Sequence, residues 1–442
     1  MAGSKNKYQK ELSEHMIGNF QSLLTFEESN FTELPDFIKN IRKNGRNSFL
    51  KNGLPTTKME EWRFTDIRPI IEKEFVSSDK RSSALVHEKL NQFTIDGTNQ
   101  ITIINGYIPT AVENHGVTVI GIKDALQLYS NIIQNHLGKI ISEDDHPFAA
   151  LNSAHFEDGI FIHVPEGFAT DIPLHLLFFN QLENLPINNH PRVLVVAENN
   201  SQIQLIEHHS GEDGDLYLTN SVTEIICTEN SSVDHIRIQE ESCSAYHISN
   251  TGYHLEKNSR INSHVMDLGG KLIRNNLVVQ LNGIGSECDL KGLYLLKNKQ
   301  HTDNFTRIHH QSPECSSREL YKGILTDHAH GIFTGRVNVH PYAKKTNAMQ
   351  TNRNLLLSDQ AVANSNPQLI INTDDVKCSH GSTTGQLNEE AIFYFQSRGI
   401  SKKDARALLI SGFASETMKS IKHTQSLQYF NNLLEIWLKG AG

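Results

Sequence analysis

The sequence lacks the features that mark secreted, membrane-spanning and nucleic-acid-binding proteins. Its five cysteines are scattered without any CxxC pair, so they indicate neither a disulfide framework nor a zinc or redox pair. No run approaches the ~18 apolar residues of a membrane helix, and residues 1–20 contain no secretory hydrophobic segment. The formal net charge of −9 argues against a nucleic-acid partner. We therefore expect a reduced, cytoplasmic protein that binds neither nucleic acid nor membrane.

The common catalytic signatures are also missing. The sequence contains no G-x-x-x-x-G-K-[ST] loop to hold nucleotide phosphates, no G-x-G-x-x-G turn, no H-E-x-x-H zinc motif and no G-x-S-x-G elbow. A chain without these motifs is not expected to hydrolyse a nucleotide, so any energy input must come from another chain. We assign no catalytic residue and expect a protein that is not an enzyme.

Residues 1–150 are predicted to be mainly helical, with a short mixed section of helix and strand. Apolar residues recur every three or four positions in two stretches, which places them on one face of a helix. The stretches comprise Leu12, Met16, Ile17, Phe20, Leu23 and Leu24, then Phe37, Ile38, Ile41 and Phe49 ahead of the breaker Asn52-Gly53. The β-branched residues of Ile101–Ile108 and Val117–Ile122 then predict short strands.

Between residues 151 and 387 the chain becomes a succession of short apolar strands separated by Asn, Gly and Ser. One sequence pattern recurs: a turn that ends in serine, followed by alternating apolar residues. The serines are Ser201, Ser232, Ser259, Ser286 and Ser317, at intervals of 31, 27, 27 and 31 residues, with further strands between them at Leu216–Cys227, Ser244–His254, Asn276–Leu281 and Phe305–His309. Such a period predicts a β-solenoid, in which each coil pairs with the strand edges of the next. A double-sheet sandwich or jelly roll is the alternative.

Residues 388–442 return to a helical pattern. Asn388 can cap a helix over Glu389–Arg398, and Gly399 suits the left-handed position that ends it. Ser401 begins a second helix, and a third contains Leu427 to Trp437. We expect these helices to cover one open end of the solenoid, because an uncapped end invites aggregation.

Most of the 23 histidines are expected to be structural. Neutral imidazole is a good ligand for iron or zinc, but a histidine on a strand is more often exposed, or buried and hydrogen-bonded. The adjacent pairs His208-His209 and His309-His310 would point to opposite faces of a strand, so neither pair can chelate one ion.

The stretch Asp374–Ser382 is the most informative for chemistry. On an extended chain Cys378 and His380 share a face about 7 Å apart, so a thiolate and an imidazole can converge. Gly381 removes side-chain bulk beside His380. The structural alternative is that Cys378 is a small core residue and His380 a turn residue. A cluster site normally takes four ligands, so a second chain would have to supply the others.

Several parts of the sequence resemble the SufB/SufD family of iron–sulfur cluster assembly proteins. The most specific is DDVKCSHGSTTGQL at Asp374–Leu387, which with Asn388–Ala391 and Phe393–Ile400 is similar to the C-terminal signature of the SufD branch rather than the SufB branch. The other parts are His301–Asn304 with Thr306-Arg307, Ser317–Leu325, Phe148–Asn152, Asp158–Phe161 and Glu61–Thr65.

The resemblance implies a right-handed parallel β-helix between helical N-terminal and C-terminal domains. It also implies a complex with a SufB-like paralogue and with two copies of a SufC-like ABC ATPase. A nascent cluster would form where the two β-helix chains meet, with His380 as this chain's candidate ligand and Cys378 beside it. The SufB-like chain is expected to accept the sulfur, so Cys227, Cys243 and Cys288 are not assigned that role.

We therefore predict a mainly β, non-catalytic scaffold of the SUF system. Residues 1–150 form the helical N-terminal domain, 151–387 the β-helix core and 388–442 a helical domain on which the ATPase docks. The metal-ligand candidates are His380 and Cys378. They would hold a transient Fe–S cluster or iron shared with the partner chain, and none is expected to bind tightly to the isolated chain, whose homodimerisation is left open.

Two other functions remain as alternatives. The first is a β-helical polysaccharide lyase or hydrolase, against which the missing signal peptide and the lack of a carboxylate cluster count. The second is a purely structural interaction module, in which His380 has no ligand role.

Overall fold

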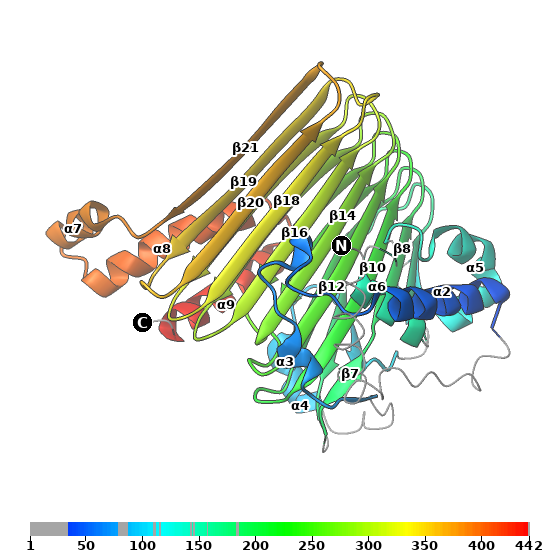
Figure 1. The fold of residues 1–442 in the computed structure, drawn as a ribbon, viewed down its shortest axis with the longest axis horizontal. Helices are drawn as coiled ribbons and strands as arrows, with labels where there is room; N and C mark the ends of the chain where they lie inside the picture. Colours follow the sequence, from blue (N-terminus) through cyan, green and yellow to red (C-terminus); the bar gives the residue numbers. More distant parts are fainter. Residues whose placement is uncertain are drawn as a thin grey trace, which may run out of the picture.

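Two long sheets make up most of the molecule (Figure 1). A computed structural model describes residues 34–77, 87–108, 112–114, 116–141, 144, 146–156, 158–182 and 185–440. Sheet A contains β1 (Val76–Ser77), β3 (Val112–Asn114), β4 (Val117–Gly121), β5 (Ile160–Val164), β7 (Ile187–Asn189), β8 (Arg192–Ala197), β10 (Tyr217–Cys227), β12 (Tyr246–Leu255), β14 (Leu272–Leu281), β16 (His301–His310), β18 (His330–Val339) and β20 (Val362–Ile371). Sheet B contains β2 (Asn99–Ile104), β6 (Leu174–Asn180), β9 (Gln202–Gly211), β11 (Ser232–Gln239), β13 (Arg260–Asp267), β15 (Glu287–Leu296), β17 (Ser316–Leu325), β19 (Thr346–Leu356) and β21 (Val376–Gly385).

The two sheets are the opposite walls of a parallel β-solenoid. From β8 onward the chain alternates between the sheets, and each strand pairs in parallel with the strand two places further along, as β17 does with β19. This arrangement gives about seven turns. Among the described strands, only the pairs β3–β4 and β4–β5 are antiparallel. The solenoid prediction is confirmed and the sandwich alternative is wrong, because sandwiches and jelly rolls are built from antiparallel strands. The right hand of the solenoid and the domain limits stay predictions.

The repeated sequence pattern comes from the turns that lead from sheet A to sheet B. Asn200, Asn230 and Asn258 adopt left-handed backbone conformations with φ of 59°, 60° and 55°, which asparagine tolerates better than most residues. Their side chains form a ladder, because the amide of Asn258 donates to Asn230 and that of Asn230 to Asn200, both at 3.2 Å.

Strand register corrects two of the predicted repeat positions. The equivalent residues are Ser201, Ser231, Ser259, Ser286 and Cys315. Ser232 and Ser317 therefore lie one and two residues beyond the repeat position. The error arose because serine also occupies the first strand positions, so composition alone does not fix the register.

The N-terminal segment packs mainly on the outer face of sheet A, while α4 and η3, at residues 87–93, pack against β6 of sheet B. The described helices before the solenoid are α2 (Asp36–Asn52), η1 (Glu60–Trp62), α3 (Arg68–Ile71), α4 (His87–Leu90), η3 (Asn91–Phe93), α5 (Ile122–His136) and α6 (Pro147–His155). Helix α2 follows the predicted apolar pattern and ends at Gly53, whose φ is 67°. The Arg274 guanidinium on β14 lies over the Trp62 ring at 4.6 Å and ties this segment to the sheet. The helix predicted around Leu12–Leu24 falls outside the described residues.

The C-terminal helices cover a wall of the solenoid and not its end. They are α7 (Glu389–Ser397), α8 (Lys402–Met418) and α9 (Thr424–Gly440), with Asn388 and Ser401 capping the first two as predicted. Apolar residues of α8 and α9 pack on the outer face of sheet B, in a cluster that includes Ile236, Leu293 and Trp437. The expectation that these helices close the open end is wrong. They instead bury the outward apolar side chains of sheet B, which would otherwise be exposed to water. No described helix combines the length and apolar character needed to cross a bilayer.

The interior of the solenoid has an apolar half and a polar half. Along sheet B, inward residues near the start of each strand are apolar, as Ile203 and Val233 are, and join one large core cluster. Towards the ends of β9 and β11 the inward residues become Glu207, His209 and Arg237, all buried. Buried charged groups are tolerated only when they are paired, so the polar half requires a network.

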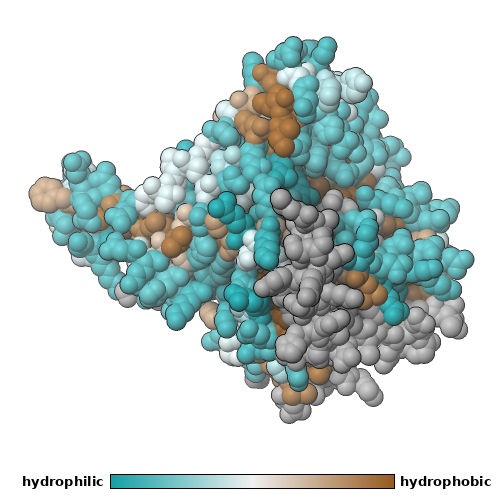
Figure 2. Space-filling view, viewed as in Figure 1, coloured by the Kyte–Doolittle hydropathy of each residue, from teal (hydrophilic) through white to brown (hydrophobic). Residues whose placement is uncertain are grey.

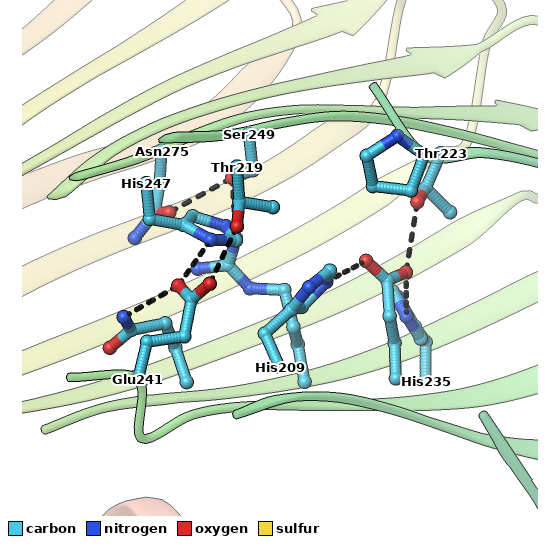
Figure 3. A network of polar contacts seen from close by, with 12 residues as sticks. His209, Thr219, Thr223, His235, Glu241, His247, Ser249 and Asn275 are labelled. Carbon is cyan, nitrogen blue, oxygen red and sulfur yellow. Dashed lines mark hydrogen bonds and ion pairs between the residues drawn. The ribbon is translucent and has the colours of Figure 1, made fainter. Parts of the chain in front are cut away.

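That network joins two glutamates to three histidines (Figure 3). Glu207 lies 2.8 Å from His209 Nε2 and 3.4 Å from His235 Nε2, and Glu241 lies 2.7 Å from His247 Nδ1. The rings of His209 and His247 meet edge to face, with their centroids 4.8 Å apart. This contact connects the part of the network around Glu207 with the part around Glu241. Burial alone would raise the pKa of both carboxyls, but their histidine partners lower the pKa of Glu207 well below its usual value and that of Glu241 to about 2.

We predict that Trp437→Ala lowers the free energy of unfolding by about 3 to 5 kcal/mol, because it removes a large buried ring from the contact between α9 and sheet B. Trp437 is 3% exposed, whereas its neighbour Ile436 is 65% exposed. Ile436→Ala is therefore the matched control and should change stability by less than about 0.5 kcal/mol. Urea unfolding followed by circular dichroism measures both. Equal effects of the two variants would contradict the assigned packing.

We also predict that Glu241 makes the fold sensitive to acid. Its pKa falls from an ordinary 4.5 to about 2 on folding, so the folded state binds fewer protons and the stabilisation is complete above about pH 4.5. It is lost as pH falls towards 2, by about 3 kcal/mol. Glu241→Gln should flatten this loss and lower stability at neutral pH, as measured by urea unfolding at several pH values. Glu229→Gln, in an exposed ion pair with Lys257, should leave the acid dependence unchanged, and an effect equal to that of Glu241→Gln would refute the role of the network.

Candidate metal-ligand site

The solenoid ends at β20 and β21, each of which has a free edge as far as the described strands go. Among those strands β20 pairs only with β18 and β21 only with β19, and the residues of both ten-residue strands are exposed or half-buried. Pro367 lies in the middle of β20, where an edge strand tolerates its missing N–H. Figure 2 shows apolar surface near the tip of the solenoid where β20 ends, and Ile370 and Ile371 are exposed there. Long free edges of this kind favour pairing with another chain.

Strand β21 places Cys378 and His380 on the inner side of this last turn. Cys378 pairs in register with Ala348, and His380 with Gln350. Both partners on β19 are buried and inward-facing, so the two β21 side chains extend the inward rows. Cys378 is half-buried against the apolar core, while His380 is exposed to solvent. The prediction that they share one face is confirmed, and their role as ligands stays a prediction.

The surroundings favour the imidazole over the thiol as a ligand. Burial raises the pKa of Cys378, which keeps its thiol protonated and makes it a weaker ligand. The imidazole of His380 is exposed to solvent, so a ligand can reach it. Within the described ranges, no three His, Cys, Asp or Glu side chains are arranged to hold a metal ion.

The histidine pairs behave as the alternation of strands predicts. His208 faces outward and meets Tyr429 of α9, whereas His209 faces inward to Glu207. Similarly, His310 lies inside at 2.9 Å from Ser317, and His309 lies near His340. The prediction that neither pair can chelate one ion is therefore confirmed.

The five cysteines are all free thiols. Cys227 and Cys288 are buried in the apolar core, where burial raises the pKa of Cys227 to about 12 and that of Cys288 well above its usual value. Neither is available as a thiolate near neutral pH. Cys243 is exposed in the turn between β11 and β12.

Two inward residues behind His380 were missed at the level of sequence. Gln350 on β19 pairs with His380, and Glu319 on β17 pairs with Gln350, so the three side chains form one column that leads inward from the open end. Their spacings of 30 and 31 residues match the repeat. Stepping back one repeat at a time from His380 would have found them, given the correct register.

Two family models together match most of the chain. The model of the SUF system FeS cluster assembly SufBD core domain matches residues 179–413, which comprise the solenoid from the end of β6 to α8. The model of the SufBD protein N-terminal region matches residues 19–176.

Individual relatives agree with these models. The chain is 33% identical over 383 residues to an iron–sulfur cluster assembly SufBD family protein of Synechocystis sp., covering 83% of this chain and 84% of that protein. It is 31% identical to the iron–sulfur cluster assembly protein SufD of Escherichia coli, covering 84% and 86%, and 26% identical to SufD of Bacillus subtilis, covering 88% and 91%. The parallel solenoid, the matched models and these relatives together place the chain in the SufBD family of iron–sulfur cluster assembly proteins.

Proposed function

We propose that this chain is a non-catalytic, cytoplasmic scaffold subunit of the SUF system that binds a SufB-like paralogue through the open end of its solenoid. The observation that carries the proposal is the pair of free edges at β20 and β21, with His380 exposed on the inner side between them. A partner of the same fold has parallel strands of matching length, so its own edges can satisfy the free N–H and C=O groups. A second copy of this chain could occupy the same edges when the partner is absent.

His380 is proposed to be a ligand to a transient Fe–S cluster, or to iron, at this junction. Its exposed imidazole leaves room for a ligand set that includes groups from the partner. Cys378 is the second candidate, although its protonated thiol makes it the weaker one. Two candidate ligands are fewer than the four that a cluster normally takes, so the isolated chain is not expected to hold a cluster tightly.

The C-terminal helices are the proposed docking surface for a SufC-like ATPase. Phe393 and Tyr394 on α7 and Leu408 on α8 are 72%, 54% and 51% exposed. Figure 1 shows α7 projecting beyond the strands, and Figure 2 shows apolar side chains at its tip. Large exposed apolar residues on a projecting element favour binding of another protein, and ATP hydrolysis by that protein would supply the energy that this chain does not.

We predict that His380→Ala abolishes cluster assembly while leaving the fold and the complex intact. Removing an exposed side chain costs less than about 1 kcal/mol, whereas a lost ligand has no nearby substitute. The measurement is iron and acid-labile sulfide per complex, after anaerobic reconstitution of this chain with its SufB-like and SufC-like partners. His328→Ala, which removes an exposed histidine from the turn before β18, is the matched control and should keep full cluster content.

A normal cluster yield in His380→Ala would exclude the ligand role. Failure of this variant to bind the partner, with normal melting, would instead indicate a purely structural role at the interface. Cys378→Ala tests the second candidate. If the thiol only packs against the core, the variant should keep its cluster content, and if the thiol is a ligand, the cluster content should fall.

We predict that Phe393→Glu combined with Leu408→Glu weakens ATPase binding at least tenfold, because a charge in an apolar contact must be desolvated. Ile436→Glu is the matched control, since it places the same charge at an exposed position on α9. Affinity is measured by titrating the purified ATPase onto the immobilised chain. Equal binding by all variants would place the docking surface elsewhere. Deleting the chain from Ser401 onward is a poor test, because α8 and α9 cover the apolar wall of sheet B.

A further inference from the structure

The inward column behind His380 leads to a buried acid. Glu319, Gln350 and His380 occupy equivalent positions on β17, β19 and β21. Neighbouring strands lie about 4.8 Å apart, so Glu319 is about 10 Å from His380, and Gln350 lies between them. Glu319 and Gln350 are 3% and 2% exposed. Within this column, the amide of Gln350 therefore lies between the buried carboxyl of Glu319 and the imidazole of His380 at the open end.

Glu319 and Gln350 share one hydrogen bond, and each has a second polar oxygen that the bond does not use. Gln350 Nε2 donates a hydrogen bond of 2.7 Å to Glu319 Oε2. The other oxygens, Gln350 Oε1 and Glu319 Oε1, are buried without a partner in the described part of the chain. Gly335 on β18 makes space for this amide, since a side chain there would collide with Gln350 Nε2. Gln350 Oε1 is thus an unused acceptor on the residue that pairs in register with His380 of β21.

We propose that Glu319 is a positioning residue whose protonation decides which end of the Gln350 amide faces His380. This inference rests on the proposed function in one respect, namely that His380 is the working group of the open end. An ionised carboxylate can only accept, so it takes the N–H of Gln350 and leaves the amide oxygen facing His380. A protonated carboxyl can donate to that oxygen, and the flipped amide then presents its NH₂ group to the imidazole.

The two orientations have opposite effects on a ligand at the open end. An amide oxygen facing His380 accepts the imidazole N–H and leaves the other ring nitrogen free for a metal. An amide NH₂ group donates to the ring nitrogen lone pair and competes with a metal for it. The buried acid thus switches the open end between a ligand-competent and a blocked state.

Glu319 is able to change charge near neutrality, whereas four titratable groups packed around it are not. Burial raises its pKa to about 7, because the hydrogen bond from Gln350 only partly offsets the loss of water. These four groups are Cys288, Tyr321, His310 and, nearer the end, Cys378. Burial raises the pKa of the two thiols and of Tyr321, and it lowers the pKa of His310 to about 4, so all four stay neutral.

Nuclear magnetic resonance of the isolated chain tests the switch without any metal. The side-chain NH₂ signals of Gln350, assigned by their loss in Gln350→Met or Gln350→Glu, are followed on both sides of the Glu319 pKa of about 7. We expect contacts from these protons to β17 at high pH and to the His380 ring at low pH. In Glu319→Gln, which is neutral at every pH, the contacts should not change. The amide of Asn352, bonded to the Tyr321 carbonyl, is an internal control that should not respond.

Co²⁺ binding to the complex with the SufB-like and SufC-like chains provides the second readout. Across the same pH range, Co²⁺ affinity should rise about three- to tenfold more in the wild type than in Glu319→Gln, the value of one hydrogen bond. A Gln350 amide that keeps one orientation at all pH values, or one that flips equally in Glu319→Gln, would overturn the inference. A flip that is observed together with Co²⁺ binding unaffected by His380→Ala would support the switch and refute the proposed ligand role of His380.

Discussion

In-register parallel pairing between successive turns is the constraint on which the rest of this structure depends. Each strand has backbone donors and acceptors on two sides, and only the turns before and after can satisfy them. The pairing fixes which residues stack, since a slip of one residue would turn every inward side chain outward. It also guarantees that the last turn, β20 and β21, has free edges unless something else covers them. The geometry of the open end therefore follows from the way the solenoid is built.

The stacking of equivalent residues also explains why the interior holds so many polar groups. Where one turn buries a glutamate, the next turns must supply its partners, as His209 and His235 do for Glu207. The apolar half gives the cohesion of a protein core, and the polar half gives specificity, because each buried charge tolerates few alternative pairings. The same rule extends to the open end, where Gln350 accompanies Glu319 but no described strand lies beyond His380.

The two sets of helices stabilise the solenoid without closing its open end. The N-terminal segment covers part of sheet A through contacts such as that of Trp62 with Arg274, and α8 and α9 cover sheet B. Both cover apolar or aromatic side chains that would otherwise face water. Because these helices lie on the walls and leave the end free, binding at the end would not need to disturb the core, and α7 projects separately from the same molecule.

The sequence by itself determined the local helices, strands and turns, and the side chains of the Asp374–Leu387 signature. Turn asparagines, helix caps at Asn388 and Ser401, and strand alternation predicted the solenoid, its flanking helices and the shared face of Cys378 and His380, because these depend on near neighbours in the chain. Tertiary structure decided the register, the place of the C-terminal helices and the column from His380 to Glu319. These depend on residues about thirty positions apart, and neither periodicity nor composition specifies which pairing buries the most surface and satisfies the most polar groups.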